Sequence, residues 1–78
     1  MLFEIKNRFS GDVIFKLETE SFKLCVEAAV KSRANPSGAD LSDADLSGAN
    51  LSGINEESVK VVKKYGWGIE ENIAVKIS

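Results

Sequence analysis

The chain has 78 residues, a formal net charge of −2 at pH 7, one cysteine and no histidine. This length allows one small domain with a marginal core, and so small a net charge does not indicate a nucleic-acid partner attracted by long-range electrostatics. The residue types exclude an internal disulfide and the common nucleophile–base pairs, so we expect a non-enzymatic protein without a metal or a cofactor.

Residues 2–17 alternate between apolar and polar side chains on both sides of Ser10-Gly11. This pattern predicts two strands around a turn, that is, a β-hairpin. We expect Phe3, Ile5 and Phe9 to share one face of the first strand. Because an isolated hairpin is only marginally stable, it must pack against another element.

A helix is predicted over residues 20–32, with Thr19 as its N-cap. On a helical wheel Lys23, Glu27 and Lys31 form one narrow stripe that faces water, and apolar residues cover the remaining surface. Such a helix must be buried on two sides. We expect it to lie between the hairpin and the first turn of the segment that follows, with Cys25 as a small core residue.

Residues 34–55 repeat a five-residue unit, and 39–43, 44–48 and 49–53 are clean copies with Ala first and Leu third. A period of five fits neither a helix nor a strand, so the chain must turn once in every unit. We place Pro36, which cannot donate a backbone hydrogen bond, at a terminal side. The expected inward residues are Ala34, Ala39, Leu41, Ala44, Leu46, Ala49, Leu51 and Ile54.

The C-terminal residues 56–78 predict a second helix and a tail strand. Asn55 is the expected N-cap, and Gly66 is the expected stop. The inner face should contain Val59, Val61, Val62 and Tyr65. Residues 72–77 alternate, so we expect a strand that joins the hairpin or pairs with a second copy in a homodimer. For Trp67, core packing is favoured over an interface role.

The tandem units resemble the pentapeptide-repeat family. The resemblance covers residues 34–55 and implies a right-handed, four-sided β-helix with one repeat on each side. The expected fold is mainly β with α caps, in one domain over residues 1–78. About one coil of this quadrilateral β-helix (34–55) is flanked by a hairpin and capping helix (1–33) and by a capping helix and tail strand (56–78).

A second resemblance lies in the order of three segments. Residues 5–15 come first, a helix ending with residues 27–32 follows, and the repeats come after the helix. This order resembles the start of pentapeptide-repeat proteins encoded by bacteriophages and prophages. It implies a small accessory protein that binds and blocks a host machine. The expected partner is a bacterial host protein or ribonucleoprotein complex, such as a CRISPR or restriction complex, or another DNA-handling machine.

Residues 34–58 contain five acidic residues and no lysine or arginine, so the repeat surface is expected to bind the partner. The candidate contact residues are Asp40, Asp43, Asp45, Asn50 and Trp67, and the alternative face is Lys60, Lys63 and Lys64. We expect no direct nucleic-acid contact, no membrane association and a cytoplasmic location in the bacterial host cell. Two alternatives stay open: an assembly module without inhibitory activity, and a short DNA-mimicking effector of DNA gyrase.

Overall fold

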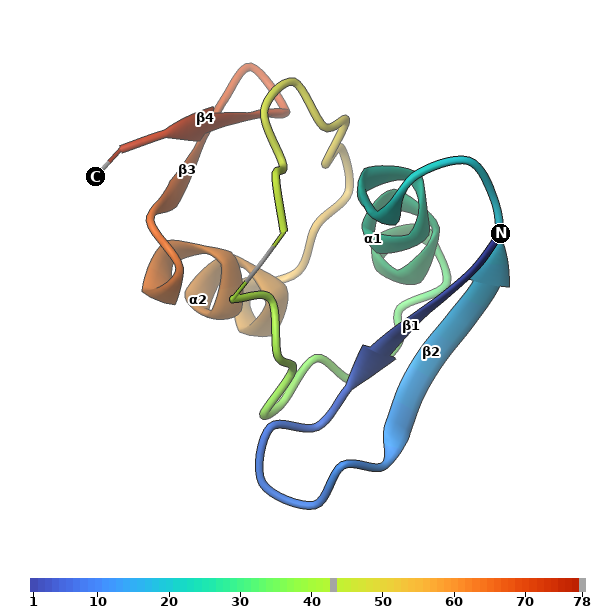
Figure 1. Ribbon diagram of the computed structural model, residues 1–78. Helices are drawn as coiled ribbons and strands as arrows, with labels where there is room; N and C mark the ends of the chain where they lie inside the picture. Colours follow the sequence, from blue (N-terminus) through green and yellow to red (C-terminus); the bar gives the residue numbers. More distant parts are fainter. Residues whose placement is uncertain (43, 78) are drawn as a thin grey trace.

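The computed structural model describes residues 1–42 and 44–77. Its elements are β1 (Leu2–Lys6), β2 (Val13–Glu18), α1 (Phe22–Lys31), α2 (Glu56–Lys64), β3 (Trp67–Glu70) and β4 (Ile73–Lys76). The strands form two antiparallel hairpins, β1–β2 and β3–β4, which lie on opposite sides of the molecule (Figure 1). The repeat segment connects α1 to α2 and passes between the two hairpins.

The first hairpin is present as predicted, but it contains a β-bulge. The register shifts between Ile5 and Lys6, which leaves Ile14 as the extra residue of β2. A bulge bends its strand and redirects a side chain, and Ile14 packs against the core. The expectation that Phe9 shares one face of the first strand with Phe3 and Ile5 is wrong, because Phe9 follows the strand and is 80% exposed.

Helix α1 begins at a different cap from the one predicted. Ser21, not Thr19, is the N-cap, and its Oγ accepts a hydrogen bond of 3.2 Å from the backbone N–H of Leu24. Thr19 is still engaged with the hairpin, since its N–H donates to the carbonyl of Met1. The helix therefore starts only after the chain has left β2.

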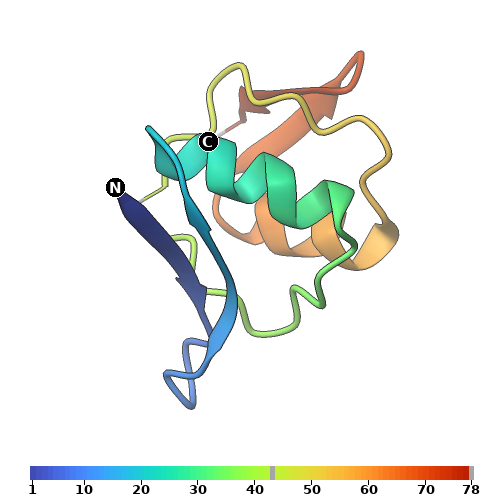
Figure 2. The same cartoon turned by 90° about the vertical axis from the view of Figure 1, so that its right-hand side faces the viewer.

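Helix α1 lies between the β1–β2 hairpin and the rest of the molecule (Figure 2). The apolar surface is less completely buried than predicted, because Leu24 is 40% exposed. The stripe predicted to face water is also different, since Lys23 and Glu27 are half-buried and only Lys31 is exposed. The buried residues of the helix are Cys25, Val26, Ala29 and Val30.

The repeat segment is a series of β-turns at five-residue intervals. Backbone hydrogen bonds close these turns from residue 39 to 36, 44 to 41, 49 to 46 and 54 to 51, with N···O distances of 2.8, 3.1, 2.9 and 3.1 Å. Gly38, Gly48 and Gly53 have φ values of 74°, 75° and 79°, and the third position of a type II turn requires a positive φ. The five-residue period is thus a turn period, as predicted.

The inward positions of the repeats supply the centre of the core. Leu46, Leu51 and Cys25 are the largest fully buried side chains. Ala39, Leu41 and Ala49 are also buried, and Ala34, Ala44 and Ile54 are half-buried against the core. The predicted repeat register is therefore confirmed.

The expected coil of β-helix is not seen as a closed solenoid in residues 1–42 and 44–77. Instead, Ala39 forms an isolated bridge with Asn7 after β1, and Asn50 forms one with Ile73 of β4. In a longer solenoid, each coil pairs with the coils above and below it. Here the two hairpins make the corresponding backbone hydrogen bonds, at Gly38 and Asp40 on one side and at Gly48, Ala49 and Leu51 on the other.

The second half of the chain confirms the predicted helix and corrects the tail. Asn55 caps α2 by accepting a 2.9 Å hydrogen bond from the N–H of Ser58, a residue that is buried although it was not predicted to be. Strand β4 does not join the first hairpin. It pairs with β3 on one edge, and on the other edge Ala74 exchanges hydrogen bonds with Gly48 and Ala49 of the repeats. The homodimer stays a prediction.

Candidate interaction surface

The outward position of each repeat carries Asp or Asn, and these side chains shape the backbone. In the four units before Asn55, Oδ1 accepts a hydrogen bond from the N–H two residues later, which is an Asx turn. The donors for Asn35, Asp40, Asp45 and Asn50 are Ser37, Ser42, Ser47 and Ser52, at 3.0, 3.1, 3.1 and 3.1 Å. Asp and Asn share this acceptor, which accounts for their exchange between repeats.

Asp40 and Asp45 are exposed carboxylates whose charged form is favoured. The hydrogen bonds from the side chain and backbone of Ser42 lower the pKa of Asp40. Those from the backbone and side chain of Ser47 lower the pKa of Asp45. A hydrogen bond to the ionised form stabilises that form, so both groups are negative at neutral pH.

Cations from outside the repeats lie near this surface. Arg8 acts on Asp40, and Lys23 and Lys76 act on Asp45, each lowering the carboxyl pKa slightly further. The repeat segment is acidic in sequence, but the folded face mixes both signs of charge. This correction arises from tertiary structure, since all three cations come from the flanking elements.

The other candidate contact residues lie in different parts of the structure. Trp67 is 4% exposed, with the Nζ of Lys76 4.8 Å from its ring centroid, so its side chain is part of the core rather than a contact residue. Asn50 is exposed on the repeats, and Asp43 lies outside the described residues. The alternative residues Lys60, Lys63 and Lys64 are exposed on α2.

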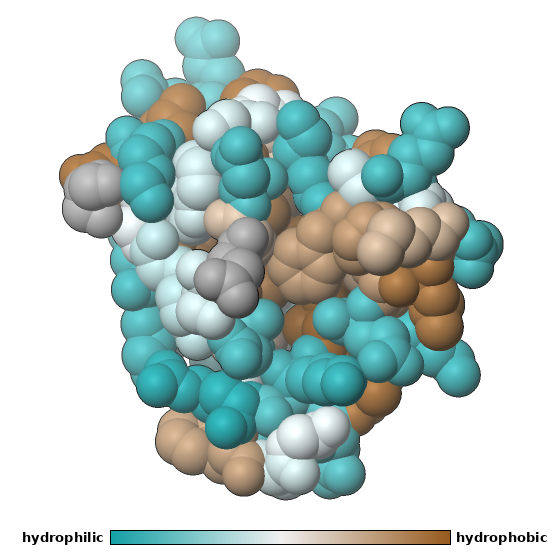
Figure 3. Space-filling model, viewed as in Figure 1, coloured by the Kyte–Doolittle hydropathy of each residue, from teal (hydrophilic) through white to brown (hydrophobic). Residues whose placement is uncertain are grey.

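A groove opens where β1 and the repeat segment diverge. It has a volume of about 260 Å³ and is lined by Phe3, Phe22, Asp40, Ser42 and Ala44. The rings of Phe3 and Phe22 are 6.1 Å apart and tilted by 56°. Figure 3 shows apolar side chains gathered on this side of the molecule, near the start of β1 and α1, with polar residues around them. The groove thus combines an aromatic surface with a carboxylate.

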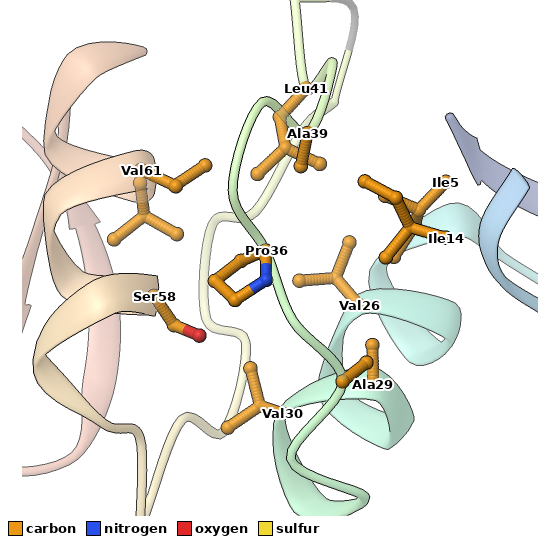
Figure 4. A pocket seen from close by; sticks show the side chains of 12 residues that line it. Ile5, Ile14, Val26, Ala29, Val30, Pro36, Ala39, Leu41, Ser58 and Val61 are labelled. Carbon is orange, nitrogen blue, oxygen red and sulfur yellow. The ribbon is translucent and has the colours of Figure 1, made fainter. Parts of the chain in front are cut away.

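A second, smaller cavity lies inside the core between α1, α2 and the first repeat (Figure 4). Its volume is about 30 Å³, which is enough space for water but little more. Pro36, Val26, Val30 and Val61 contribute to its apolar wall, and Ser58 is its hydroxyl-bearing residue. This cavity is a packing gap and has no room for an organic ligand.

The described residues offer no cluster of three or more potential metal ligands from His, Cys, Asp and Glu. Within the same part of the chain, none of the helices is long and apolar enough to span a membrane. Cys25 is fully buried, and burial raises the pKa of its thiol. A neutral, inaccessible thiol is a packing residue, as predicted.

The sequence comparisons identify one segment of the chain. Residues 32–55 match a family model described as "Pentapeptide repeats (8 copies)". The matched segment coincides with the turns and Asx motifs described above, and the hairpins and α2 lie outside it. No curated protein and no solved structure matches the chain.

Proposed function

We propose that this chain is a non-catalytic, phage-type protein that inhibits a bacterial defence system, such as a CRISPR or restriction complex, or another DNA-handling machine. It acts by binding a protein component of that machine. The observation that carries the proposal is the open groove, which presents Phe3 and Phe22 beside Asp40. Aromatic surface next to a fixed charge is the combination that protein interfaces use for anchoring contacts.

The proposal includes a scaffold in which the repeats form about one right-handed, four-sided coil. Turns every five residues support it, since each turn makes one corner. The bridges of Ala39 and Asn50 support it as well, because these residues lie two repeats apart and pair with hairpins on opposite sides. In this scaffold the hairpins act as caps and hold the groove at a fixed position.

Imitation of DNA toward gyrase is a weaker explanation of the acidic repeats. A duplex presents one negative charge for about every 1.7 Å of its axis. The described repeats place cations near both Asp40 and Asp45, which breaks a continuous negative surface. An assembly module without inhibitory activity is the remaining alternative, and the experiment below separates it from an inhibitor.

The test is a phage plaquing assay in bacteria that carry defined defence systems. Strains with individual restriction or CRISPR systems are infected with and without expression of the chain. An inhibitor restores plaquing in at least one strain and has no effect in the matched strain without the system. If expression of the folded chain leaves plaquing unchanged across the panel, the inhibitory function is wrong.

A further inference from the structure

One edge of β1 has no strand paired with it in the described residues. The carbonyl of Lys6 accepts a 2.8 Å hydrogen bond from the N–H of Asp40, so Lys6 points away from β2. Alternate residues of an antiparallel strand point their backbone groups to the same side, which places those of Leu2 and Glu4 on this outer edge. No described backbone group outside β1 and β2 bonds to Leu2 or Glu4.

The groove begins at the point where this pairing stops. After Asp40 the repeat turns away, with the N–H of Ala44 bonded back to the carbonyl of Leu41. The 260 Å³ groove lies here, lined by Phe3 of β1, Phe22 of α1, and Asp40, Ser42 and Ala44 of the repeats. Phe3 belongs both to β1 and to the lining of the groove, so the unpaired strand edge lies next to an apolar groove.

Asp40 marks one end of this groove with a negative charge. Both hydrogen bonds from Ser42, at 3.1 Å from N–H and 2.7 Å from Oγ, reach Oδ1. Oδ2 has no protein donor in the described part of the chain, and Arg8 makes no ion pair with this carboxylate there. The carboxylate is oriented by Ser42 and retains one oxygen for a ligand.

We infer that the groove binds an extended, basic peptide segment of a partner protein, added as a third strand to the edge of β1. This inference rests on the proposed function and names the chemistry of its partner. The segment's main chain pairs with Leu2 and Glu4. One apolar side chain lies on Phe3 and Phe22, and a lysine or arginine two residues away reaches Oδ2 of Asp40. Backbone pairing supplies affinity in such strand addition, and the side-chain pockets supply sequence preference.

The experiment is a selection from a random-peptide display library against the full chain. Selected peptides should share a basic residue two positions from an apolar one. Asp40→Asn keeps the Oδ1 acceptor of the Asx turn and removes the charge, and it should weaken binding about tenfold, as expected for one charge-assisted hydrogen bond. Asp45→Asn makes the same change one repeat later, outside the groove, and should leave the affinity unchanged.

Two further measurements test strand addition itself. Methylation of the peptide amides that face β1 should abolish binding, and methylation of the alternate amides should not. In NMR titrations of the labelled chain, the amides of Leu2, Glu4 and Ala44 should shift together. Failure to select any peptide that binds better than its scrambled form, or equal affinities for the two Asn variants, would overturn the groove assignment.

The plaquing assay distinguishes this failure from failure of the proposed function. Restored plaquing that Asp40→Asn does not impair would leave the inhibitor in place and move its binding site elsewhere. Peptide binding at the groove without any effect on plaquing would keep the peptide site and reject the inhibitory function.

Discussion

The carboxylate of Glu27 on α1 accepts a 3.1 Å hydrogen bond from the backbone N–H of Asn50 in the repeats. One helical turn earlier, the Nζ of Lys23 donates a 3.1 Å hydrogen bond to the carbonyl of Ser47. An acidic and a basic side chain of one helix thus satisfy a donor and an acceptor of the same repeat region. These bonds attach α1 directly to the repeats at Ser47 and Asn50.

We predict that Glu27→Ala destabilises the fold by about 1 kcal/mol, the net contribution of a half-exposed hydrogen bond. Urea denaturation followed by circular dichroism measures the change. Lys31→Ala is the matched control, because Lys31 lies on the same helical stripe and is exposed. Equal stabilities of the two variants would show that the bond to Asn50 does not contribute.

Leu46→Ala should destabilise the chain by about 2 to 5 kcal/mol, because Leu46 is 0% exposed and its removal leaves a cavity. A domain of this size has a total stability near the lower end of about 5 to 15 kcal/mol, so the variant should be close to unfolded at room temperature. Leu24→Ala on the outer side of α1 is the control. Thermal melting of both variants tests the repeat register, which a melting temperature near that of the parent would contradict.

Gly38 and Gly48 occupy equivalent turn positions, yet their substitutions should differ. Each has a positive φ, so alanine costs about 1 kcal/mol at either site. At Gly38 the added Cβ would also lie 2.6 Å from Nδ2 of Asn7, whereas nothing lies within 4 Å at Gly48. Because Asn7 is held by the N–H groups of Phe9 and Ser10, it cannot move without losing those bonds. In chemical denaturation, Gly38→Ala should therefore have a clearly lower free energy of unfolding than Gly48→Ala. Equal losses of stability in the two variants would contradict this packing argument.

Much of the core could be predicted because the repeats carry their own register. Ala and Leu two residues apart point inward, and the cap at Asn55 has a local signature that needs no tertiary information. Phe9 and Thr19 were misassigned for the opposite reason. Phe9 continues the alternating pattern of the first strand in sequence, but it lies in the hairpin turn. Thr19 is a suitable capping residue, but its N–H bonds to the carbonyl of Met1 and keeps it in the hairpin.

Strand β3 was missed because its signals are unusual. The β3–β4 turn contains Glu71 and Asn72 with φ values of 50° and 70°, and a turn with two positive φ values usually contains glycine. Gly68 instead lies within β3, where a Cβ would approach Cγ2 of Ile77 to 2.8 Å.

The groove could not be predicted from the sequence, because it is formed by residues that are distant in the chain. It brings Phe3 and Phe22 next to Asp40, Ser42 and Ala44 of the repeats.

Pro36→Leu should leave the stability unchanged or raise it. Pro36 occupies the position that leucine holds in the clean repeats, and it lines the 30 Å³ core cavity together with Val30 and Val61. Leucine supplies a larger apolar side chain to fill that gap, which stabilises the folded state. The loss of proline's restriction on the unfolded chain acts in the opposite direction and offsets part of this gain. A loss above about 1 kcal/mol in urea denaturation would show that the fixed φ of proline is needed between α1 and the repeats.

Stability should fall in acid partly through Asp40 and Asp45. Their pKa values are lowered in the folded state from the ordinary value of 3.8. As the pH falls, the unfolded chain therefore binds more protons than the folded chain. The contribution of the two ionised carboxylates to the free energy of unfolding is complete above the unfolded pKa, and it is lost as the pH falls through the folded pKa. The double variant Asp40→Asn, Asp45→Asn keeps both Asx acceptors without titrating. Its urea midpoint should fall less steeply than the parent's between about pH 5 and pH 2. Parallel curves for the two proteins would mean that other carboxylates account for the acid sensitivity.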